Sequence, residues 1–437
     1  MRFYDREQEL RLLTDIERQS HSSATFTVLM GRRRVGKTAL IMRSLQGVDN
    51  AYLFVSKDSE AMLCSKFQEA LETQLDMRIY GAVNRFRDLF EIIMRESIKR
   101  PISIVLDEFQ NLQKINSAIF SEMQDIWDRY HSQSHINLIT SGSITSLMKS
   151  IFEDENQPLY GRPTHKFVLR PFTIEVQKQI LADHSPTYTN EDLLCLYMIT
   201  GGVAKYVELL MDAGCYTKEK MLNNVCRLDS YFLTEGRDII NTEFGSDYNT
   251  YYSILQLIAN GANRRGDIDG ALQKDTGVYL SNLERNFGMI SRLKPMLAAS
   301  HSKISSYEIS DLFLRFWFRF VCPYQSLIES GQLKLLRSNI SAHYDQFSGK
   351  TLERYFQTQL METGDYTQVG NWWDRKGENE IDIIAINEFT HEALAAEVKR
   401  NERKISLHVL EEKIDRLPKQ QFGKYTFRTI GLSIDDM

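Results

Sequence analysis

The chain has 437 residues, which is enough for two to four domains that each bury a hydrophobic core. Its composition, 42% hydrophobic and 25% charged, is ordinary for a globular protein, and its net charge of -5 excludes a global attraction to nucleic acid, so that such contacts would need a local basic patch. Five scattered cysteines argue against zinc ligands and disulfides, and a charged N-terminus without any long apolar run predicts a cytoplasmic protein with no membrane partner.

The first elements of the chain surround a glycine-rich loop. Residues 3–13 predict a polar entry followed by an amphipathic helix. The apolar run at residues 25–30 predicts a buried strand, and residues 38–45 predict a helix. Between them, residues 31–38 read GRRRVGKT and match the P-loop pattern without a mismatch. The motif therefore stands where its mechanism requires, between a strand and a helix.

A loop of this kind binds the phosphates of a nucleoside triphosphate. Its backbone N–H groups and the following helix N-terminus supply partial positive charge. Lys37 is expected to reach the β- and γ-phosphates, and the Thr38 hydroxyl is expected to ligate Mg²⁺. The alternative is a chance Gly/Lys turn on a basic surface. We expect ATP or ADP with Mg²⁺ to contact the whole loop and the residue after it, namely Gly31, Arg32, Arg33, Arg34, Val35, Gly36, Lys37, Thr38 and Ala39.

A pair of acids follows the third predicted strand. Residues 51–56 predict the second strand, and residues 102–107 predict the third, which ends in Asp107 and Glu108. An apolar strand running into paired acids about 70 residues after a P-loop is the Walker B arrangement. Asp107 would hold the Mg²⁺ shell, and Glu108 would polarise the attacking water. Helices are predicted over residues 60–76, 84–99 and 117–131.

Polar residues also end the fourth predicted strand, at residues 136–140. In additional-strand P-loop ATPases a polar residue at this strand end touches the γ-phosphate or the water. Thr140 or Ser141 fits this role, although an N-cap of the next helix explains them as well. Further on, Arg162 follows a tight turn in PLYGR. It is either an arginine finger on the phosphates or a solvated surface charge.

Taken together, these motifs resemble the archaeal-type ATPases, a family related to the AAA+ and STAND groups. The resemblance rests on FYDREQEL, GRRRVGKT, IVLDEF, ITSGS, PLYGR and GGVAKYV. It implies an α/β fold, an additional-strand P-loop NTPase core with a parallel sheet, in which Phe3 and Arg6 lie near the nucleotide. The family's usual Gly-Gly-x-Pro motif is GGVA at residues 201–204, so the proline that approaches the base is missing.

The next segments predict a helical lid and a winged helix. Residues 171–240 are helical throughout, as in the lid that follows the core of such ATPases. Residues 241–325 predict three helices and a hairpin that turns at residues 300–302. DNA reading and a purely packing role are both open for this segment. The residues available for DNA contact are Tyr279, Ser281, Asn282 and Arg285 on a recognition helix at 277–287, with Arg264, Arg265 and Lys274 for phosphates.

The last hundred residues predict a small α/β domain with a second candidate site. Asp382 lies in an otherwise apolar strand, where an unpaired carboxylate would be costly. On the neighbouring strand, Glu397 and Lys399 alternate and therefore share a face. This is the constellation of PD-(D/E)XK nucleases, in which Asp382 and Glu397 bind a divalent metal and Lys399 orients or deprotonates the water.

Glu353, on a helix predicted at residues 351–361, can complete this metal shell. A structural ion pair between the two acids and the lysine is the alternative. Archaeal-type ATPases often end in a domain of unknown function related to restriction-endonuclease-like folds, and GNWWD, EID and EVK match its motifs. A basic strip beside these motifs, suited to a phosphate backbone, consists of Lys399, Arg400, Arg403 and Lys404.

The sequence therefore predicts an ATP-binding and ATP-hydrolysing protein that acts on double-stranded DNA through a winged helix and a metal-dependent nuclease-like domain. The alternative is a STAND-like regulatory switch without nuclease activity. A helicase is disfavoured because no helicase motif follows the Walker B segment, and oligomerisation is left open. The expected domains are an ATPase core at 1–170, a lid at 171–240, a winged helix at 241–325, a helical connector at 326–345 and a nuclease-like domain at 346–437.

Overall fold

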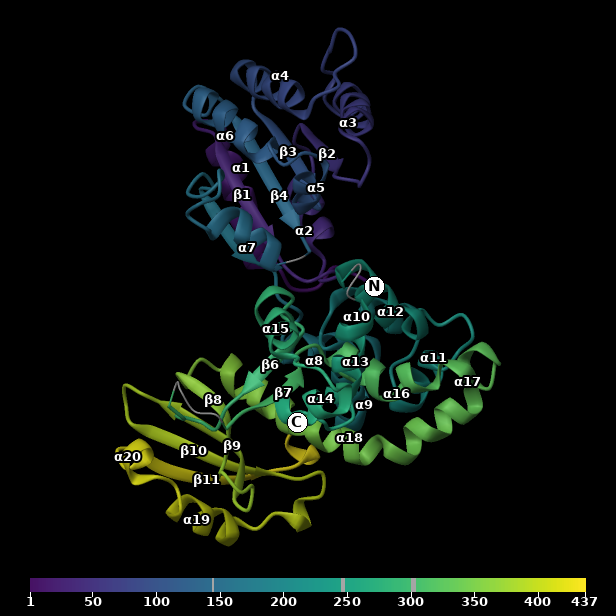
Figure 1. Cartoon of the computed structure of the whole chain (residues 1–437), viewed down its shortest axis with the longest axis vertical. Coiled ribbons are helices and arrows are strands. Elements are labelled where there is room, and N and C mark those ends of the chain that lie inside the picture. The colour runs from purple at the N-terminus through teal and green to yellow at the C-terminus, as the bar shows by residue number, and fades with distance from the viewer. Residues whose placement is uncertain (144, 245–247, 300–303) are drawn as a thin grey trace. The chain divides into compact units, whose positions relative to one another are not determined.

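The computed structural model describes residues 1–437 except 144, 245–247 and 300–303 (Figure 1). The chain forms two compact units. The P-loop unit is Tyr4–Pro171, and the C-terminal unit is Phe172–Met437 together with Met1–Phe3. The change of unit falls beside residue 170, where we expected the ATPase core to end.

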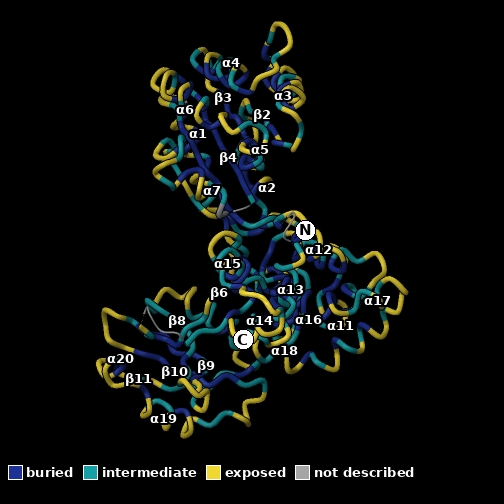
Figure 2. The backbone as a smooth tube through the Cα atoms, viewed as in Figure 1, coloured by how far each residue is buried: buried dark blue, intermediate teal, exposed yellow. Residues whose placement is uncertain are grey.

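The P-loop unit is built on a five-stranded parallel sheet with the order β2-β3-β4-β1-β5. Strand β4 lies between β1 and β3, which is the additional strand that the sequence predicted. Every residue of β1, β3 and β4 is buried, as the dark tube in Figure 2 shows. The strands are β1 (Thr25–Met30), β2 (Asn50–Phe54), β3 (Ile102–Asp107), β4 (Ile136–Gly142) and β5 (His165–Val168).

Side chains that alternate along the strands supply two cores, one on each face of the sheet. Phe26, Val28 and Met30 face the core under α3, α4, α6 and α7, whereas Leu29 faces the core under α1 and α2. The helices are α1 (Glu7–Ser20), α2 (Lys37–Ser44), α3 (Glu60–Leu75), α4 (Phe86–Lys99), α5 (Leu112–Ile115), α6 (Ile119–Tyr130) and α7 (Thr145–Glu153), with the short η1 (Phe109–Asn111).

The C-terminal unit begins with a helical segment gathered around α9. Residues 192–200 of this helix are all buried, because α8, α10, α11, α16 and α18 pack against it. The sequence LLCLYMIT is apolar on every side for this reason. The segment contains α8 (Ile174–His184), α9 (Asn190–Thr200), α10 (Ala204–Asp212), α11 (Lys218–Val225) and α12 (Tyr231–Phe244).

Three helices and a two-stranded antiparallel sheet follow, in the order that the winged-helix prediction requires. Ile290 pairs with Ile309 in this sheet, and the turn expected at residues 300–302 lies outside the described residues. The elements are α13 (Tyr248–Ala259), α14 (Arg265–Leu272), α15 (Gly277–Ser281) with the π-helix η3 (Asn282–Asn286), β6 (Ile290–Leu293) and β7 (Ser306–Ile309).

The aromatic run after the hairpin forms α16 (Leu312–Phe320), whose Trp317 is fully buried, as expected for core. Short η4 (Cys322–Tyr324) and α17 (Gln325–Glu329) then lead into α18 (Leu333–Glu362). This single helix runs through residue 346, where we expected a connector to give way to a new domain. Residues 333–345 of the expected connector are therefore part of the helix that carries Glu353.

The last segment is a four-stranded sheet with the order β11-β10-β9-β8. Strands β8, β9 and β10 are antiparallel neighbours, and β11 joins β10 in parallel after the crossover through α19. The elements are β8 (Gln368–Trp373), β9 (Glu380–Asn387), β10 (Glu392–Val398), η5 (Glu402–Lys404), α19 (Leu407–Asp415), α20 (Lys419–Phe422), β11 (Thr426–Leu432) and η6 (Ile434–Asp436). Among the described residues, no helix has the length and apolar character of a membrane span.

Candidate functional site

The P-loop lies between the end of β1 and the start of α2, as the motif predicted. Gly31 has a φ of 154°, and a Cβ added there would stand 2.6 Å from the carbonyl oxygen of Leu169, so the loop has no room for a side chain at this position. Gly36 has a φ of 101° where the chain turns into α2. Backbone crowding and positive φ explain both glycines.

Lys37 lies folded back into this loop. Its Nζ donates hydrogen bonds to the carbonyl oxygens of Gly31, at 2.9 Å, and Arg32, at 3.2 Å. Burial lowers the pKa of Lys37, while the nearby charges of Glu108 and Asp107 oppose that shift. The ammonium group therefore stands inside the loop at the place where phosphate oxygens would bind.

The Asp107 carboxylate accepts hydrogen bonds from side chains of α2, β2 and β4. Its Oδ2 accepts hydrogen bonds from the Thr38 hydroxyl at 3.0 Å and from the Tyr52 hydroxyl at 2.6 Å. Its Oδ1 accepts from the Ser141 hydroxyl and, at 3.0 Å, from the backbone N–H of Glu108. Thr38 and Asp107, the two residues predicted to hold Mg²⁺, are thus in direct contact. Hydroxyl and carboxylate oxygens beside a phosphate loop suit this ion.

Glu108 follows in a left-handed conformation, with a φ of 56°. Its Oε2 accepts hydrogen bonds from the Gln110 side-chain amide at 2.5 Å and from the Ser143 hydroxyl at 2.9 Å. The carboxylate that we expected to polarise water is therefore held by two neighbours in this conformation.

The sequence did not single out Tyr52, Gln110 or Ser143. Tyr52 lies in a strand that pairs with β3, so its hydroxyl reaches Asp107 only through the parallel register of β2 and β3. Ser143 belongs to the polar stretch after β4 that we did notice, but Thr140 in that stretch donates to the Thr27 carbonyl at 3.3 Å inside the sheet. Of the two strand-end candidates, Ser141 is therefore the one that faces the acids.

The remaining candidates for nucleotide contact, in the P-loop and near the N-terminus, differ in how far they are buried. Val35 is only 1% exposed and packs in the core beside α1 and α2, so it offers the loop's backbone rather than a polar side chain. Arg6 is buried, and its guanidinium donates to the Arg170 carbonyl at 2.6 Å and to Glu9 at 3.2 Å. Phe3 belongs to the C-terminal unit and is about one-third exposed, at 37%. Nucleotide contact stays a prediction for the other residues of this group, which are Phe3, Arg6, Arg32, Arg33, Arg34 and Ala39.

Arg162 lies towards the opposite edge of the sheet from its own P-loop, and its role as an arginine finger stays a prediction. Its guanidinium pairs with Asp128 at 2.9 Å, near the end of α6 that leads into the start of β4. Two residues later, the Thr164 N–H donates to the Phe26 carbonyl at the start of β1. In a parallel sheet these positions belong to the amino edge, whereas the P-loop follows the carboxyl edge. A role towards a neighbouring copy stays a prediction.

The second candidate site lies where β9 and β10 run side by side. Lys399 Nζ stands 2.9 Å from Asp382 Oδ2 and 3.5 Å from Glu397 Oε1, so it bridges the two carboxylates. Asp382 Oδ2 also accepts the Val398 N–H at 2.9 Å, and Glu397 Oε2 accepts the Ser406 N–H at 2.9 Å. The structure brings together the three residues predicted from strand alternation.

Charge coupling within this set fixes the protonation of Lys399. Burial alone would lower the pKa of Lys399, but the hydrogen bond and the charge of Asp382 outweigh it, and Glu397 acts in the same direction. The net result is a raised pKa, so Lys399 is a charged hydrogen-bond donor in this arrangement. It must give up a proton before it can accept one from water.

Glu353 approaches the same region from α18. It pairs with Lys350 at 3.3 Å, and burial raises its pKa to about 7, with Lys350 opposing and Asp382 adding to the shift. Within the described part of the chain, no group of three or more His, Cys, Asp or Glu side chains is arranged to hold a metal ion. Asp382 and Glu397 offer two carboxylates, which fits an ion such as Mg²⁺ that keeps several waters, while Glu353 as a third ligand stays a prediction.

Comparisons with known proteins agree with this architecture. A family described as an ATPase domain predominantly from Archaea matches residues 3–210, and one described as "Archaea bacterial proteins of unknown function" matches residues 317–413. An uncharacterized protein of Methanocaldococcus jannaschii is 30% identical over 408 residues, which are 91% of this chain and 87% of that protein. The chain belongs to the archaeal-type ATPase family.

Solved structures of two archaeal proteins share the fold. A Walker-type ATPase of Pyrococcus abyssi is similar with a TM-score of 0.53 and 18% identity, over 72% of this chain and 96% of that one. The ORC2 protein of Aeropyrum pernix, solved in ADPNP–ADP complexes, has a TM-score of 0.50 and 14% identity, over 75% and 94% of the two chains. At these identities the similarity concerns the fold alone, and the P-loop NTPase fold is thereby confirmed.

This archaeal-type ATPase departs from the family's Gly-Gly-x-Pro motif without losing the turn. Gly201 and Gly202 have φ values of 55° and 73°, and the Phe172 N–H donates to the Gly202 carbonyl at 2.8 Å. A Cβ on Gly202 would lie 2.4 Å from the Phe172 carbonyl oxygen. Ala204 stands at the first position of α10, where proline is readily accommodated and where alanine also suits a helix.

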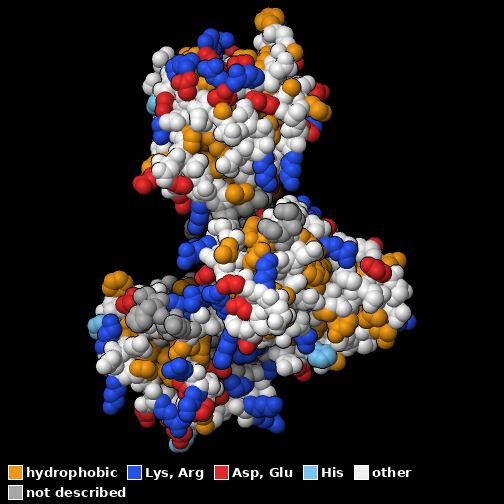
Figure 3. Space-filling model, in the orientation of Figure 1, with side chains coloured by type: hydrophobic (Ala, Val, Ile, Leu, Met, Phe, Trp, Pro, Cys, Tyr) orange, Lys and Arg blue, Asp and Glu red, His pale blue; other side chains and the backbone are white. Residues whose placement is uncertain are grey.

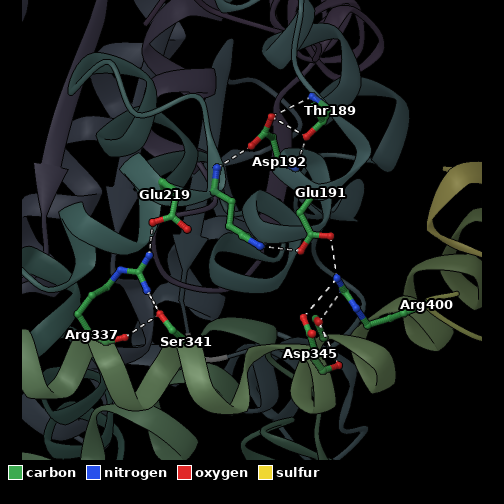
Figure 4. A network of polar contacts seen from close by, with 10 residues as sticks. Thr189, Glu191, Asp192, Glu219, Arg337, Ser341, Asp345 and Arg400 are labelled. Carbon is green, nitrogen blue, oxygen red and sulfur yellow. Dashed lines mark hydrogen bonds and ion pairs between the residues drawn. The ribbon is translucent and has the colours of Figure 1, made fainter.

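The basic strip predicted beside Lys399 is partly engaged within the fold. Figure 4 shows Arg400 pointing towards Glu191 and Asp345. The Arg400 guanidinium stands 2.8 Å from the Glu191 carboxylate and 3.5 Å from the Asp345 carboxylate. Lys218 also pairs with Glu191, at 3.3 Å. Arg400 therefore ties the end of β10 to α9 and α18, and its charge is not available to a phosphate backbone in this structure.

Two of the residues predicted to contact DNA in this archaeal-type ATPase have partners within the fold. Asn282 donates to the Tyr251 hydroxyl at 3.1 Å, and Arg265 pairs with Asp269 at 3.3 Å and with Asp275 at 3.0 Å. After β6, the Met296 N–H donates to the Asn371 carbonyl at 2.9 Å, and its side chain joins the core of the C-terminal sheet. DNA reading and a packing role, the two alternatives for this segment, both stay predictions.

Proposed function

We propose that this member of an ATPase family binds Mg·ATP at the P-loop and hydrolyses it with the residues gathered around Asp107. The observation that carries the proposal is the contact of Asp107 with Thr38 and Ser141, which draws the P-loop, the Walker B strand and the additional strand to one point. Lys37 would exchange its two carbonyl partners for phosphate oxygens. Bound Mg²⁺ supplies charge neutralisation at the phosphates, held by Thr38 and Asp107.

Glu108 is the proposed residue that orients and polarises the attacking water. To do so, its carboxylate must turn away from Gln110 and Ser143, which now hold it. Hydrolysis is then expected to be slow until the bound nucleotide favours the released conformation of Glu108. In this role Glu108 acts through its carboxylate charge, which a glutamine of the same length lacks.

Two substitutions test this site. Lys37→Ala should abolish ATP binding, measured by fluorescent-nucleotide titration, because the phosphates lose the cation of the loop. Glu108→Gln should bind ATP with unchanged affinity and release no phosphate. Lys99→Ala, on the surface of α4, is the control for the first and should behave like the parent chain. Unchanged nucleotide affinity in Lys37→Ala, or full turnover in Glu108→Gln, would remove these residues from their roles.

As the second activity, we propose metal-dependent hydrolysis of DNA phosphodiester bonds at Asp382, Glu397 and Lys399. The supporting observation is that Lys399 bridges both carboxylates at the ends of neighbouring strands. Asp382 and Glu397 would hold the divalent ion that stabilises charge at the scissile phosphate. Lys399, once its two carboxylate partners are shared with a cation, would orient the water.

The test is nicking or cleavage of double-stranded DNA by the purified chain with Mg²⁺ or Mn²⁺, with and without ATP. Lys399→Ala should lose cleavage and keep ATP hydrolysis, while Lys419→Ala, on the surface of α20, should keep both. Cleavage that survives in Lys399→Ala would contradict the assignment of this lysine.

A regulatory switch in the manner of STAND proteins is the second candidate function. The contacts that hold Glu108 favour it, because a chain that hydrolyses ATP slowly can remain in one nucleotide state. Absence of cleavage under every condition, together with persistent ATP binding and slow turnover, would support the switch and demote the C-terminal carboxylates to a structural ion pair.

A further inference from the structure

The C-terminal unit contains a cavity of about 880 Å³ that the nucleotide site does not use. Its walls come from α13, β7, α16, α18 and the turn between β8 and β9. Residues far apart in the sequence, such as Arg264, Arg315, Glu353 and Arg375, face the same space. Its size suits one or two nucleotide units, since small-molecule sites commonly measure 300–1,000 Å³.

The lining of this cavity is predominantly basic. Its three carboxylates are outnumbered by six Lys and Arg side chains, which are Arg264, Arg315, Arg319, Lys350, Arg354 and Arg375. Figure 3 shows Lys and Arg side chains gathered, with some carboxylates among them, where the β6–β7 hairpin meets the C-terminal sheet. The excess cannot be explained by the composition of the chain, whose net charge is -5. It suits an anionic ligand.

Arg315 is a half-buried cation in this lining that has no ion-pair partner in the described part of the chain. Its guanidinium donates to the Thr351 hydroxyl at 3.2 Å and lies over the Phe347 ring at 4.6 Å. Within the described residues, no carboxylate stands within ion-pair distance of it, whereas Lys350 is paired with Glu353 and Glu380. An anionic partner is favourable for a half-buried guanidinium, because part of its hydration is lost.

The pKa of Arg315 also reflects the shortage of negative charge around its guanidinium. Burial lowers the pKa of the Arg315 guanidinium to about 10, and the neighbouring charge of Arg354 acts in the same direction. Glu308 and Glu353 oppose the shift without cancelling it. An additional negative charge in the cavity would therefore be favourable.

Aromatic side chains and a link to the candidate nuclease site complete the cavity. Trp373, at the end of β8, is half-buried and lines the cavity, so its ring can stack on a base, while the buried Tyr307 of β7 forms part of the wall. Gln357 also lines the cavity and donates to the Asp382 carbonyl at 3.2 Å. Glu353 lines it too and interacts electrostatically with Asp382. The cavity thus adjoins the carboxylates of the second candidate site.

We propose that this cavity binds a single-stranded nucleic-acid segment, with a backbone phosphate on Arg315 and a base against Trp373, next to Asp382 and Lys399. The inference rests on the proposed action on DNA and adds the position at which a separated strand is held. Binding needs neither ATP nor a metal ion, because the groups involved are side chains of the cavity alone.

The experiment is a fluorescence-anisotropy titration of the full chain with a labelled oligothymidylate in EDTA and without ATP. Arg315→Met keeps the length of the apolar side chain and removes the charge, and it should weaken binding about tenfold, as expected for the loss of a charge-assisted contact. Arg227→Met, which removes a guanidinium paired with Asp229 at an exposed position, is the matched control and should bind like the parent chain.

A second variant guards against a folding defect in Arg315→Met. Arg264→Gln changes an exposed residue of the cavity rim and should also weaken binding, with a shallower dependence of affinity on salt. Parental affinity in both cavity variants, or an equal loss in Arg227→Met, would overturn the proposal.

Competitors distinguish a strand from smaller ligands of the same chemistry. Thymidine 5′-monophosphate and inorganic phosphate should displace the oligonucleotide only at far higher concentration. Displacement by the mononucleotide as effective as displacement by unlabelled oligothymidylate would identify a free-nucleotide site and overturn the strand proposal. DNA cleavage is measured separately. If Arg315→Met weakens oligonucleotide binding but the parent chain cleaves no DNA, the nuclease proposal alone is rejected. If the parent chain cleaves DNA and Arg315→Met binds the oligonucleotide like the parent chain, the cavity proposal alone is rejected.

Discussion

Asp107 owes its fixed position to hydrogen-bond donors from α2, β2 and β4 and from the next residue in the chain. Tyr52 and Thr38 share one of its oxygens, and Ser141 and the Glu108 N–H share the other. Burial and the hydrogen bond to Asp107 raise the pKa of Tyr52, so its hydroxyl remains a donor throughout the neutral range. An orienting donor of this kind sets how readily a carboxylate accepts a cation.

We therefore expect Tyr52→Phe to raise the Mg²⁺ concentration for half-maximal ATP hydrolysis by about tenfold, as is usual when a ligand loses an orienting partner. Nucleotide affinity in EDTA should be unchanged, because Lys37 and the loop are intact. The measurement is a Mg²⁺ titration of phosphate release. Tyr130→Phe removes a comparable bond, from the Tyr130 hydroxyl to Glu91 at 2.7 Å, and should leave the titration unaltered. An unchanged Mg²⁺ dependence in Tyr52→Phe would deny this tyrosine a role.

The raised pKa of Glu353 leads us to expect that the stability of the C-terminal unit depends on pH. Its pKa is raised to about 7 chiefly by burial, so the folded chain holds this proton more tightly than the unfolded chain does. The contribution to stability is full below the ordinary glutamate pKa and is lost as pH rises towards 7, by on the order of 2 kcal/mol.

Replacement of this group by glutamine should remove the pH dependence. In EDTA, the free energy of unfolding of the parent chain should fall between pH 5 and pH 8 relative to Glu353→Gln, whose neutral amide does not titrate. Urea unfolding at several pH values provides the measurement. Parallel curves for the two proteins would show that Glu353 is ionised in the folded chain at pH 5. The partners that face it, Lys350, Asp382 and Glu380, are the same in both proteins.

Among the elements, those with a strong apolar pattern were predictable. Strand β3 was expected at residues 102–107 and is found there, because its six residues are all buried between two cores. Strand β5 was not expected, because its alternating half-buried sequence HKFV carries no apolar run. Helix α18 was divided in prediction because Ser, Asn and Gly residues weaken its middle, and packing of Leu336, Ile340 and Tyr344 sustains it instead.

The candidate sites show the same limit. Spacing alone identified Lys37, Asp107 and the Asp382–Lys399 pair, because strand ends and strand alternation place them. Tyr52 and Arg315 required the structure, since their partners depend on which strands and helices become neighbours. Arg400 was assigned to a phosphate surface because nothing in the local sequence reveals Glu191, which is more than two hundred residues away.

Helices α12 and α16 are in contact at a glycine, and this contact yields an element-scale prediction. A Cβ on Gly236 would lie 2.2 Å from the ring of Trp317, whose Nε1 donates to the Leu233 carbonyl at 3.1 Å. Gly236→Ala should destabilise the C-terminal unit by about 1–3 kcal/mol, because overpacking outweighs the gain in helix propensity. Chemical unfolding measures the change.

The control is another helical glycine with no neighbour. Gly270, in α14, has nothing within 4 Å of an added Cβ, so Gly270→Ala should raise stability by about 0.5–1 kcal/mol. If Gly236→Ala were as stabilising as Gly270→Ala, α12 and α16 would not be in the close contact described here.

At the scale of the whole molecule, each unit has its own core and its own candidate site. The P-loop unit packs on both faces of one parallel sheet and contains Lys37, Asp107 and Glu108. The C-terminal unit contains a separate core under its four-stranded sheet, together with Asp382, Glu397 and Lys399 and the basic cavity. Chains with separate cores commonly unfold in more than one step.

Calorimetry should therefore resolve two unfolding transitions that respond to different perturbations. Mg·ATP at about 100 times its dissociation constant stabilises a binding unit by about 2.7 kcal/mol and should raise one transition by several degrees. Lys37→Ala should abolish that shift, whereas Gly236→Ala should lower the other transition and leave the response to ATP intact. A single transition that moves with both the nucleotide and Gly236→Ala would show instead that the two units unfold as one cooperative body. In that case ATP binding would act directly on the stability of the C-terminal site.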